Sequence, residues 1–214
     1  DVNTDKATYE IQFGSVERPT HKNTSWDAAK FEVCGHKYMD ISDYGYGVSL
    51  LNDCKYGYNV DNGTMKLSLF KCATYPDPDA DKGKHVFTYS LFPHAGNYRD
   101  AGTVQLAYEI NNPLKASLID KQNGTLPEEY SFVSCDKDNF IVETVKKAEN
   151  SDDIIVRGYE SYNKGTSVTL NFGFDVKEAI LCDLLERDVE KLTVENNSVS
   201  FKAKPFEIIT IKVK

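Results

Sequence analysis

The stretch Tyr-Gly-Tyr-Asn-Val-Asp-Asn-Gly-Thr-Met-Lys-Leu-Ser-Leu, residues 56–69, decides the fold class. Apolar side chains occupy alternate positions on both sides of Asn62-Gly63, which is the period of a strand with one buried face. An Asn-Gly pair readily adopts the positive φ angles of a two-residue turn. The segment therefore predicts a β-hairpin.

The same alternation recurs toward the C-terminus. Residues 154–159 resemble a strand, residues 162–165 a turn, and the alternation returns over residues 168–174. Residues 199–203 predict a further strand, which Pro205 ends, and residues 209–213 predict the last one. Short strands with frequent turns are typical of β-sandwiches and not of a parallel sheet. We therefore predict an all-β protein.

Two polar segments interrupt the strands. Residues 74–84 carry two prolines and several charges, and residues 121–129 have a similar character, so both are predicted to be surface loops. The second is the better domain boundary, because the strands that follow it can form a small sandwich of their own. We place the two predicted domains at residues 1–127 and 128–214.

Composition excludes several classes of partner. The net charge of −8 and the pI of about 5.1 disfavour nucleic acid. No apolar run approaches the roughly 20 residues that cross a bilayer, and the first residues lack the features of a signal peptide. The five cysteines are scattered and include no CxxC pair, which favours a reducing, cytoplasmic setting.

Several segments in one order carry a resemblance to a known family. The most specific are Val16-Glu-Arg-Pro-Thr-His-Lys-Asn-Thr-Ser-Trp-Asp27 and Tyr46-Gly-Val-Ser-Leu-Leu-Asn-Asp-Cys-Lys-Tyr-Gly57. Others are residues 31–40, 76–81, 93–94, 107–114, 142–149, 155–160, 183–186 and 204–208. Together they resemble the C-terminal region of glycoside hydrolase family 38 α-mannosidases of the bacterial and cytosolic subgroup, nearly end to end.

The resemblance implies an architecture. It places the second part of a large β supersandwich, of the kind shared with galactose mutarotases, in residues 1–127, and a small C-terminal β-sandwich in residues 128–214. Residues 176–192 carry apolar residues at helical spacing, but the resemblance implies strand there, and we predict strand.

The resemblance also implies a retaining, zinc-dependent hydrolysis of α-mannosides, whose carboxylates and zinc ligands lie in an N-terminal catalytic domain outside this chain. None of the four histidines begins a His-x-Asp motif, and HExxH is absent. We therefore assign no catalytic residue and no metal ligand here, and expect the chain alone to be inactive. Its expected partners are that catalytic domain and an α-mannoside, and an exposed apolar surface left by the missing half would favour self-association.

Two groups of residues are candidates for a role in the intact enzyme. The family places a basic residue of its large β domain near the sugar, so Lys55 with Asn52, Asp53 and Tyr56 forms a predicted substrate-binding group; an ordinary strand end is the alternative. The second group is predicted to contact the catalytic domain or to brace the Lys55 loop, although we expect the indole of its tryptophan to pack in the core. Its members are Arg18, His21, Asn23 and Trp26.

The four histidines have simpler interpretations. His36 and His94 lie among apolar or proline-adjacent positions and are predicted to be structural. His85 lies beside the acidic residues 77–81, where a calcium site is conceivable but a solvated loop is the preferred interpretation.

Two other functions stay open. A free-standing carbohydrate-binding module would present stacked aromatic rings on an exposed face. A mutarotase-like epimerase would need a histidine and a glutamate that converge in one cleft as acid and base.

Overall fold

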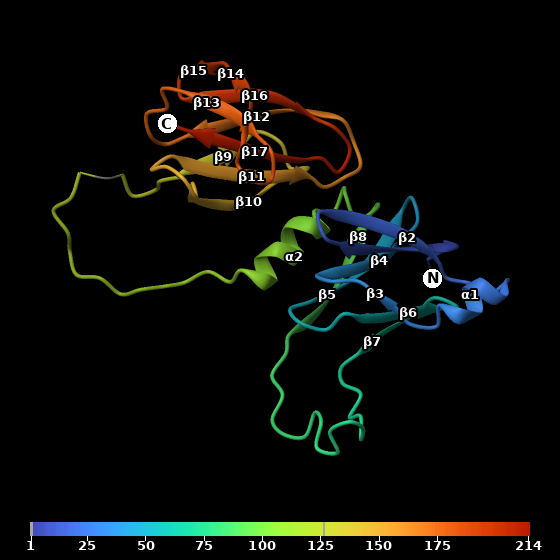
Figure 1. The fold of residues 1–214 in the computed structure, drawn as a ribbon. Coiled ribbons are helices and arrows are strands. Elements are labelled where there is room, and N and C mark those ends of the chain that lie inside the picture. Colours follow the sequence, from blue (N-terminus) through green and yellow to red (C-terminus); the bar gives the residue numbers. More distant parts are fainter. Residues whose placement is uncertain (1, 126) are drawn as a thin grey trace. The chain divides into compact units, whose positions relative to one another are not determined.

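The predicted hairpin is present. Strand β6 (Gly57–Asp61) pairs antiparallel with β7 (Thr64–Ser68), and the turn between them places Asn62 and Gly63 at φ angles of 49° and 71°. These positive angles are those that favour Asn and Gly at a turn. The computed structural model describes residues 2–125 and 127–214, and it divides into two units, residues 1–115 and 116–214, which are described one at a time (Figure 1).

The first unit contains eight strands and two helices among its described residues. They are β1 (Lys6–Ile11), β2 (Gly14–Pro19), α1 (Ser25–Ala29), β3 (Val33–Cys34), β4 (Tyr38–Ser42), β5 (Tyr46–Asn52), β6, β7, β8 (Tyr89–Ala95) and α2 (Thr103–Asn111). A long irregular segment joins β7 to β8 (Figure 1). It contains the predicted loop at residues 74–84, which has neither helix nor strand.

These strands form two antiparallel sheets with a shared core. The five-stranded sheet has the order β2-β1-β4-β5-β8, and the three-stranded sheet has the order β3-β6-β7. Buried residues from both sheets pack together as Ala7, Tyr9, Met39, Ile41, Leu50, Tyr58 and Val60. The alternation read from the sequence thus supplies one apolar face to each sheet.

Helix α2 was not predicted from the sequence. It lies against β4 and β5, and its buried side chains, Thr103, Val104 and Ala107, fall within little more than one turn. It covers the face of the five-stranded sheet opposite the core. No helix of the described residues is long and apolar enough to cross a membrane.

The second unit is a sandwich of two antiparallel sheets. One has the order β10-β11-β17-β13-β14 and the other β15-β16-β12-β9. The strands are β9 (Val133–Cys135), β10 (Phe140–Lys147), β11 (Ile154–Glu160), β12 (Thr166–Phe172), β13 (Ala179–Cys182), β14 (Asp188–Leu192), β15 (Val194–Glu195), β16 (Ser198–Ala203) and β17 (Ile208–Val213). Since β11 lies in the first of these sheets and β12 in the second, the predicted turn after β11 is one of the places where the chain crosses between the sheets.

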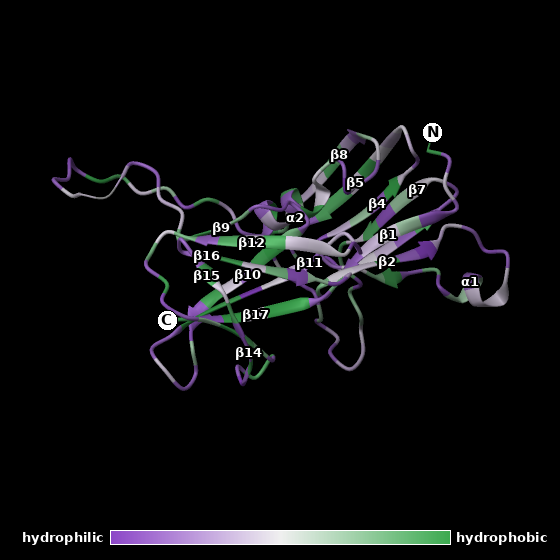
Figure 2. Ribbon diagram, turned by 90° about the horizontal axis from the view of Figure 1, so that it is seen from above, coloured by the Kyte–Doolittle hydropathy of each residue, from purple (hydrophilic) through white to green (hydrophobic). Residues whose placement is uncertain are grey.

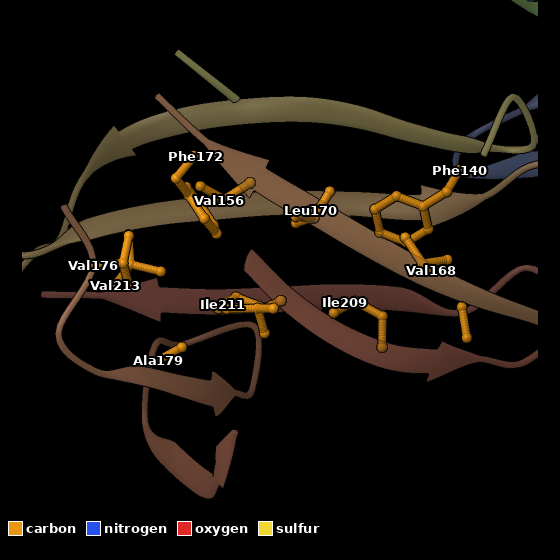
Figure 3. Close-up of a cluster of buried hydrophobic side chains, with 12 residues drawn as sticks. Phe140, Val156, Val168, Leu170, Phe172, Val176, Ala179, Ile209, Ile211 and Val213 are labelled. Atoms are coloured by element: carbon orange, nitrogen blue, oxygen red, sulfur yellow. The ribbon is translucent and has the colours of Figure 1, made fainter. Parts of the chain in front are cut away.

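Both sheets of this sandwich contribute to one apolar core. Figure 3 shows Phe140, Val156, Ile209 and Ile211 of the larger sheet and Leu170 of the smaller one within the same cluster. Strand β17 lies inside the larger sheet, and Figure 2 colours most of it as hydrophobic. An interior strand is paired on both sides, so its apolar residues form the centre of the core.

The all-β prediction is confirmed, including the ambiguous stretch at residues 176–192. That stretch contains β13 and β14 and no helix. β13 pairs with β17 from Ala179↔Val213 to Cys182↔Thr210, and this long-range pairing overrides the helical spacing. The units divide after Lys115, whereas we placed the domain boundary after residue 127. Both positions fall between α2 and β9, where the described residues form no helix or strand.

Replacing Ile211 with alanine is expected to lower the free energy of unfolding of the second unit by about 2–5 kcal/mol, because the side chain is fully buried. Chemical denaturation of the whole chain measures this change. The matched control is Val189→Ala on β14, where the side chain is 65% exposed and the expected change stays within about 0.5 kcal/mol. Equal effects of the two substitutions would contradict the packing described above.

Candidate functional site

The side chain of Asn52 fixes the loop that follows β5. Asn52 is fully buried, and its Nδ2 donates to the carbonyl oxygen of His36 at 2.9 Å and to the hydroxyl of Tyr58. Its Oδ1 accepts from the backbone N–H groups of Cys54 and Lys55. The amide is therefore used within the fold, and its role is to shape the loop.

Asp53 ties the same loop to the chain that enters β8. Its Oδ2 accepts from the backbone N–H of Thr88 at 3.0 Å, and its own N–H donates to the carbonyl oxygen of Thr88 at 3.2 Å. The hydrogen bond from the Cys54 thiol, assisted by Thr88, lowers the pKa of Asp53 below its usual value. Its other oxygen, Oδ1, is buried and has no hydrogen-bond partner among the described residues. The carboxylate is ionised and directed mainly into the fold.

Lys55 holds its ammonium group over aromatic rings. Its Nζ lies 5.1 Å from the ring centroid of Phe87 and 5.8 Å from that of Phe70. Phe87 stacks in turn on Tyr89, and the side chains of Phe70 and Tyr89 are both about half exposed. The contacts are of the cation–π type. A charged donor and aromatic faces near solvent are the groups that bind sugar hydroxyls and C–H faces.

Tyr56 completes the loop. Its side chain is 49% exposed, and its ring packs edge-on against the His36 ring at 5.0 Å. The four predicted substrate-binding residues of this loop thus fall into two pairs with different surroundings. Asn52 and Asp53 hydrogen-bond within the fold and position the backbone, whereas Tyr56 is about half exposed and Lys55 is partly exposed. Their contact with substrate stays a prediction.

The second predicted group is not brought together. The guanidinium carbon of Arg18 lies 4.8 Å from the Tyr9 ring centroid, and its Nη1 is buried without a partner among the described residues. His21 lies 3.6 Å from the Asp27 carboxylate, and the backbone N–H of Asn23 donates to His21 Nδ1 at 3.4 Å. Among the described residues, no hydrogen bond, ion pair or ring contact joins Arg18 to the other three members.

The expectation that Trp26 packs in the core is wrong. Its side chain is 79% exposed, and helix α1, which carries it, has no buried residue. The helix is defined by a capping box in which Thr24 and Asp27 exchange hydrogen bonds. Local capping therefore decides this segment, and the indole is left on the surface.

His94 belongs to a buried polar network that sequence analysis missed. Its Nε2 lies 2.8 Å from Asp40 Oδ2, and the Ser49 hydroxyl donates to the same oxygen at 2.8 Å. Ser49 also contacts the Thr103 hydroxyl at 2.8 Å, which links α2 to the sheet. Because the serine and the histidine both bind the carboxylate, and all are buried, the network is structural. His94 is buried as expected of a structural histidine, but its Nδ1 has no hydrogen-bond partner among the described residues.

His36 lies next to a buried glutamate. Its Nδ1 is 3.6 Å from Glu10 Oε2, while Lys37 Nζ binds the other carboxylate oxygen of Glu10 at 2.9 Å. The histidine and glutamate contact each other directly and do not face each other across a cleft, as an epimerase would require. His36 is thus partly buried beside Glu10, and its structural role stays a prediction.

No metal site is assigned. His85 is exposed, and its Nε2 lies 2.7 Å from the carbonyl oxygen of Asp81. Across residues 2–125 and 127–214, no group of three or more His, Cys, Asp and Glu side chains is arranged to hold a metal ion. The resemblance places the zinc ion in the catalytic domain outside this chain, and among the described residues the calcium alternative near His85 gains no support.

Comparisons with known proteins match nearly the whole chain. Residues 1–79 match the glycosyl hydrolases family 38 C-terminal domain, and residues 139–211 match the glycosyl hydrolases family 38 C-terminal beta sandwich domain. The chain is 43% identical to alpha-mannosidase 2C1 of Homo sapiens over 98% of its own length, and 38% identical to an alpha-mannosidase of Saccharomyces cerevisiae over 99%.

The fold has relatives among solved structures. An alpha-mannosidase from Enterococcus faecalis superposes with a TM-score of 0.81 at 20% identity and covers 99% of this chain. The chain spans only 20% of the human relative, 21% of the yeast relative and 24% of the bacterial chain. By sequence and by fold, the chain belongs to the C-terminal region of glycoside hydrolase family 38.

Proposed function

We propose that the chain is the non-catalytic C-terminal portion of a retaining, zinc-dependent α-mannosidase, where it packs against the catalytic domain and supports the active site. The curated relatives that support this are named as alpha-mannosidases and are about five times longer than the chain. The nucleophile, the general acid and the zinc ligands would come from the remainder of the polypeptide. The five free cysteines favour a reducing, cytoplasmic compartment.

The observation that carries the packing role is an uncovered part of the core face of the five-stranded sheet. In the β5–β8 register, Leu50 pairs with Leu91 and Val48 with Pro93, so these side chains share one face. Leu50 is 5% exposed beneath the three-stranded sheet, whereas Leu91 on the neighbouring strand is 64% exposed. The apolar face of the five-stranded sheet therefore extends beyond the area that the three-stranded sheet covers.

The outer edge of this face also lacks a paired strand among the described residues. β8 is an edge strand, so one row of its backbone N–H and C=O groups has no ladder partner in residues 2–125 and 127–214. Tyr89, on the same face as Leu91, is 56% exposed. Burying a leucine side chain contributes about 1.5–3 kcal/mol. We propose that the part of the polypeptide outside this chain covers β8.

The loop after β5 is the part of this chain that we propose to contact the substrate at the active site. Asn52 and Asp53 hold the backbone of this loop, and the aromatic rings beneath Lys55 hold its ammonium group. Lys55 would donate a charge-assisted hydrogen bond to a mannoside hydroxyl, and Tyr56 would add a ring face and a second donor. This role requires no proton transfer by any residue of the chain.

The first test is hydrolysis of an aryl α-mannoside by the chain alone, with and without added zinc. We expect no turnover in either case, because the groups that attack the anomeric carbon lie elsewhere in the polypeptide. The full-length protein, assayed in parallel, should turn the substrate over. Zinc-dependent hydrolysis by the chain alone would refute the proposal, and mannose affinity without turnover by either protein would favour a carbohydrate-binding module.

The second test replaces Lys55 with methionine in the full-length protein. The expected result is a fall in kcat/KM of about ten- to a hundredfold, because a hydrogen bond from a charged donor contributes about 1.5–3 kcal/mol. Lys66→Met, on the exposed side of β7, is the matched control and should leave kcat/KM unchanged. Loss of thermal stability without any loss of kcat/KM would show that Lys55 only braces the loop.

A further inference from the structure

The segment Cys34-Gly35-His36 is fixed between the two sheets of the first unit. The backbone N–H of Gly35 donates to the carbonyl oxygen of Tyr56 at 3.1 Å, and that of His36 donates to the carbonyl oxygen of Glu10 at 3.0 Å. A Cβ atom on Gly35 would lie 3.1 Å from the Tyr58 ring, so the backbone there is tightly enclosed. Cys34 and His36, two residues apart, are therefore held in a defined relative position.

The thiol of Cys34 is exposed and lies beside the His36 ring. The distance from Cys34 Sγ to His36 Nε2 is 4.0 Å, and Gln12 Nε2 lies 3.4 Å from the same nitrogen. The thiol also lies 3.9 Å from the carbonyl oxygen of Gly35, which it can donate to. Among the described residues, Cys34 is the only cysteine whose sulfur lies within hydrogen-bond distance of a histidine nitrogen.

The neighbours of the His36 ring favour one of its two tautomers. Glu10 Oε2, 3.6 Å from Nδ1, only accepts, which favours the proton on Nδ1. The thiol and the Gln12 amide, both at Nε2, are donors, which favours a lone pair there. The order carboxylate, imidazole, thiol is that of an activated cysteine, in which the base is oriented by a third group.

We propose that Cys34 is a nucleophilic thiol and a modification site for soft electrophiles and small-molecule disulfides, with His36 as its base and Glu10 as the positioning residue. With an alkyl iodide, the sulfur forms a bond to carbon, the carbon–iodine bond breaks, iodide leaves, and His36 Nε2 takes the thiol proton. With a disulfide, the sulfur forms a bond to one sulfur of the reagent. The other sulfur leaves as a thiol with the proton from His36, so there is no net oxidation.

The remaining cysteines provide internal comparisons. The neighbouring Asp53 side chain raises the pKa of the Cys54 thiol, which disfavours its thiolate although the residue is exposed. Burial raises the pKa of Cys135 and Cys182. Cys72 is exposed and serves as the benchmark for an unassisted thiol. The four differ from Cys34 in that no histidine nitrogen lies beside their sulfur in the described residues.

The test is the rate of carbamidomethylation of each cysteine in the folded chain. The chain is treated with limiting iodoacetamide at neutral pH, and modified peptides are quantified by mass spectrometry over time. We expect Cys34 to react on the order of tenfold faster than Cys72, a small part of what a positioned base contributes in enzymes. Cys54 should react more slowly than Cys72. A Cys34 rate no higher than that of Cys72 would overturn the proposal.

Two variants test whether the reactivity of Cys34 depends on the His36 base or only on the exposure of the thiol. His36→Asn should lower the Cys34 rate to that of Cys72, and Glu10→Gln should lower it in part, because the ring keeps its place but loses the carboxylate at Nδ1. His21→Asn, at an exposed histidine near Asp27, is the matched control and should leave the Cys34 rate unchanged. Circular dichroism checks that each variant is folded. If Cys34 is still modified fast in the folded His36→Asn variant, the proposal is also overturned. If that variant does not fold, the ranking of the cysteine rates in the wild-type chain and the Cys34 rate in Glu10→Gln decide.

Discussion

The core face of the five-stranded sheet is wider than the three-stranded sheet packed on it, and this mismatch leaves the β8 end of the face exposed in the described residues. Met39, Ile41 and Leu50 are buried beneath the smaller sheet, while Leu91 continues the same face into solvent. An edge strand with exposed apolar residues is unfavourable in an isolated protein. We propose that this face packs against the remainder of the polypeptide, since the chain spans a fifth of the length of its curated relatives.

Around this face, the fold places polar residues where they fix loops and helices. Asp40, Ser49 and His94 form a buried network on the opposite side of the sheet, and Thr103 connects it to α2. Asn52 shapes the loop at the end of β5, so that the proposed sugar-binding side chains project from a rigid base. The position of Lys55 thus follows from buried hydrogen bonds and from the rings under its ammonium group.

Sequence analysis predicted the fold where local signals agree with tertiary pairing. The hairpin at residues 56–69 was predictable because alternation and an Asn-Gly turn specify the same structure. Trp26 was placed wrongly, although Thr24 and Asp27 carry a capping signal that could have identified an exposed helix. The contact between Asp40 and His94 could not be predicted, because it joins residues 54 positions apart whose strands pair with β5 on opposite sides. The loop at residues 52–56 was identified as a candidate through the family resemblance. Only the structure shows which of its side chains hydrogen-bond within the fold.

The central claim, that the remainder of the polypeptide covers β8, is tested most directly by amide hydrogen exchange of residues 89–95. The rate is measured in this chain alone and in the full-length protein, with β17 of the second unit as an internal reference. The account predicts that the β8 amides that face away from β5 exchange fast in the isolated chain and are strongly protected in the full-length protein, with β17 protected in both. Equal exchange of β8 in the two proteins would contradict it.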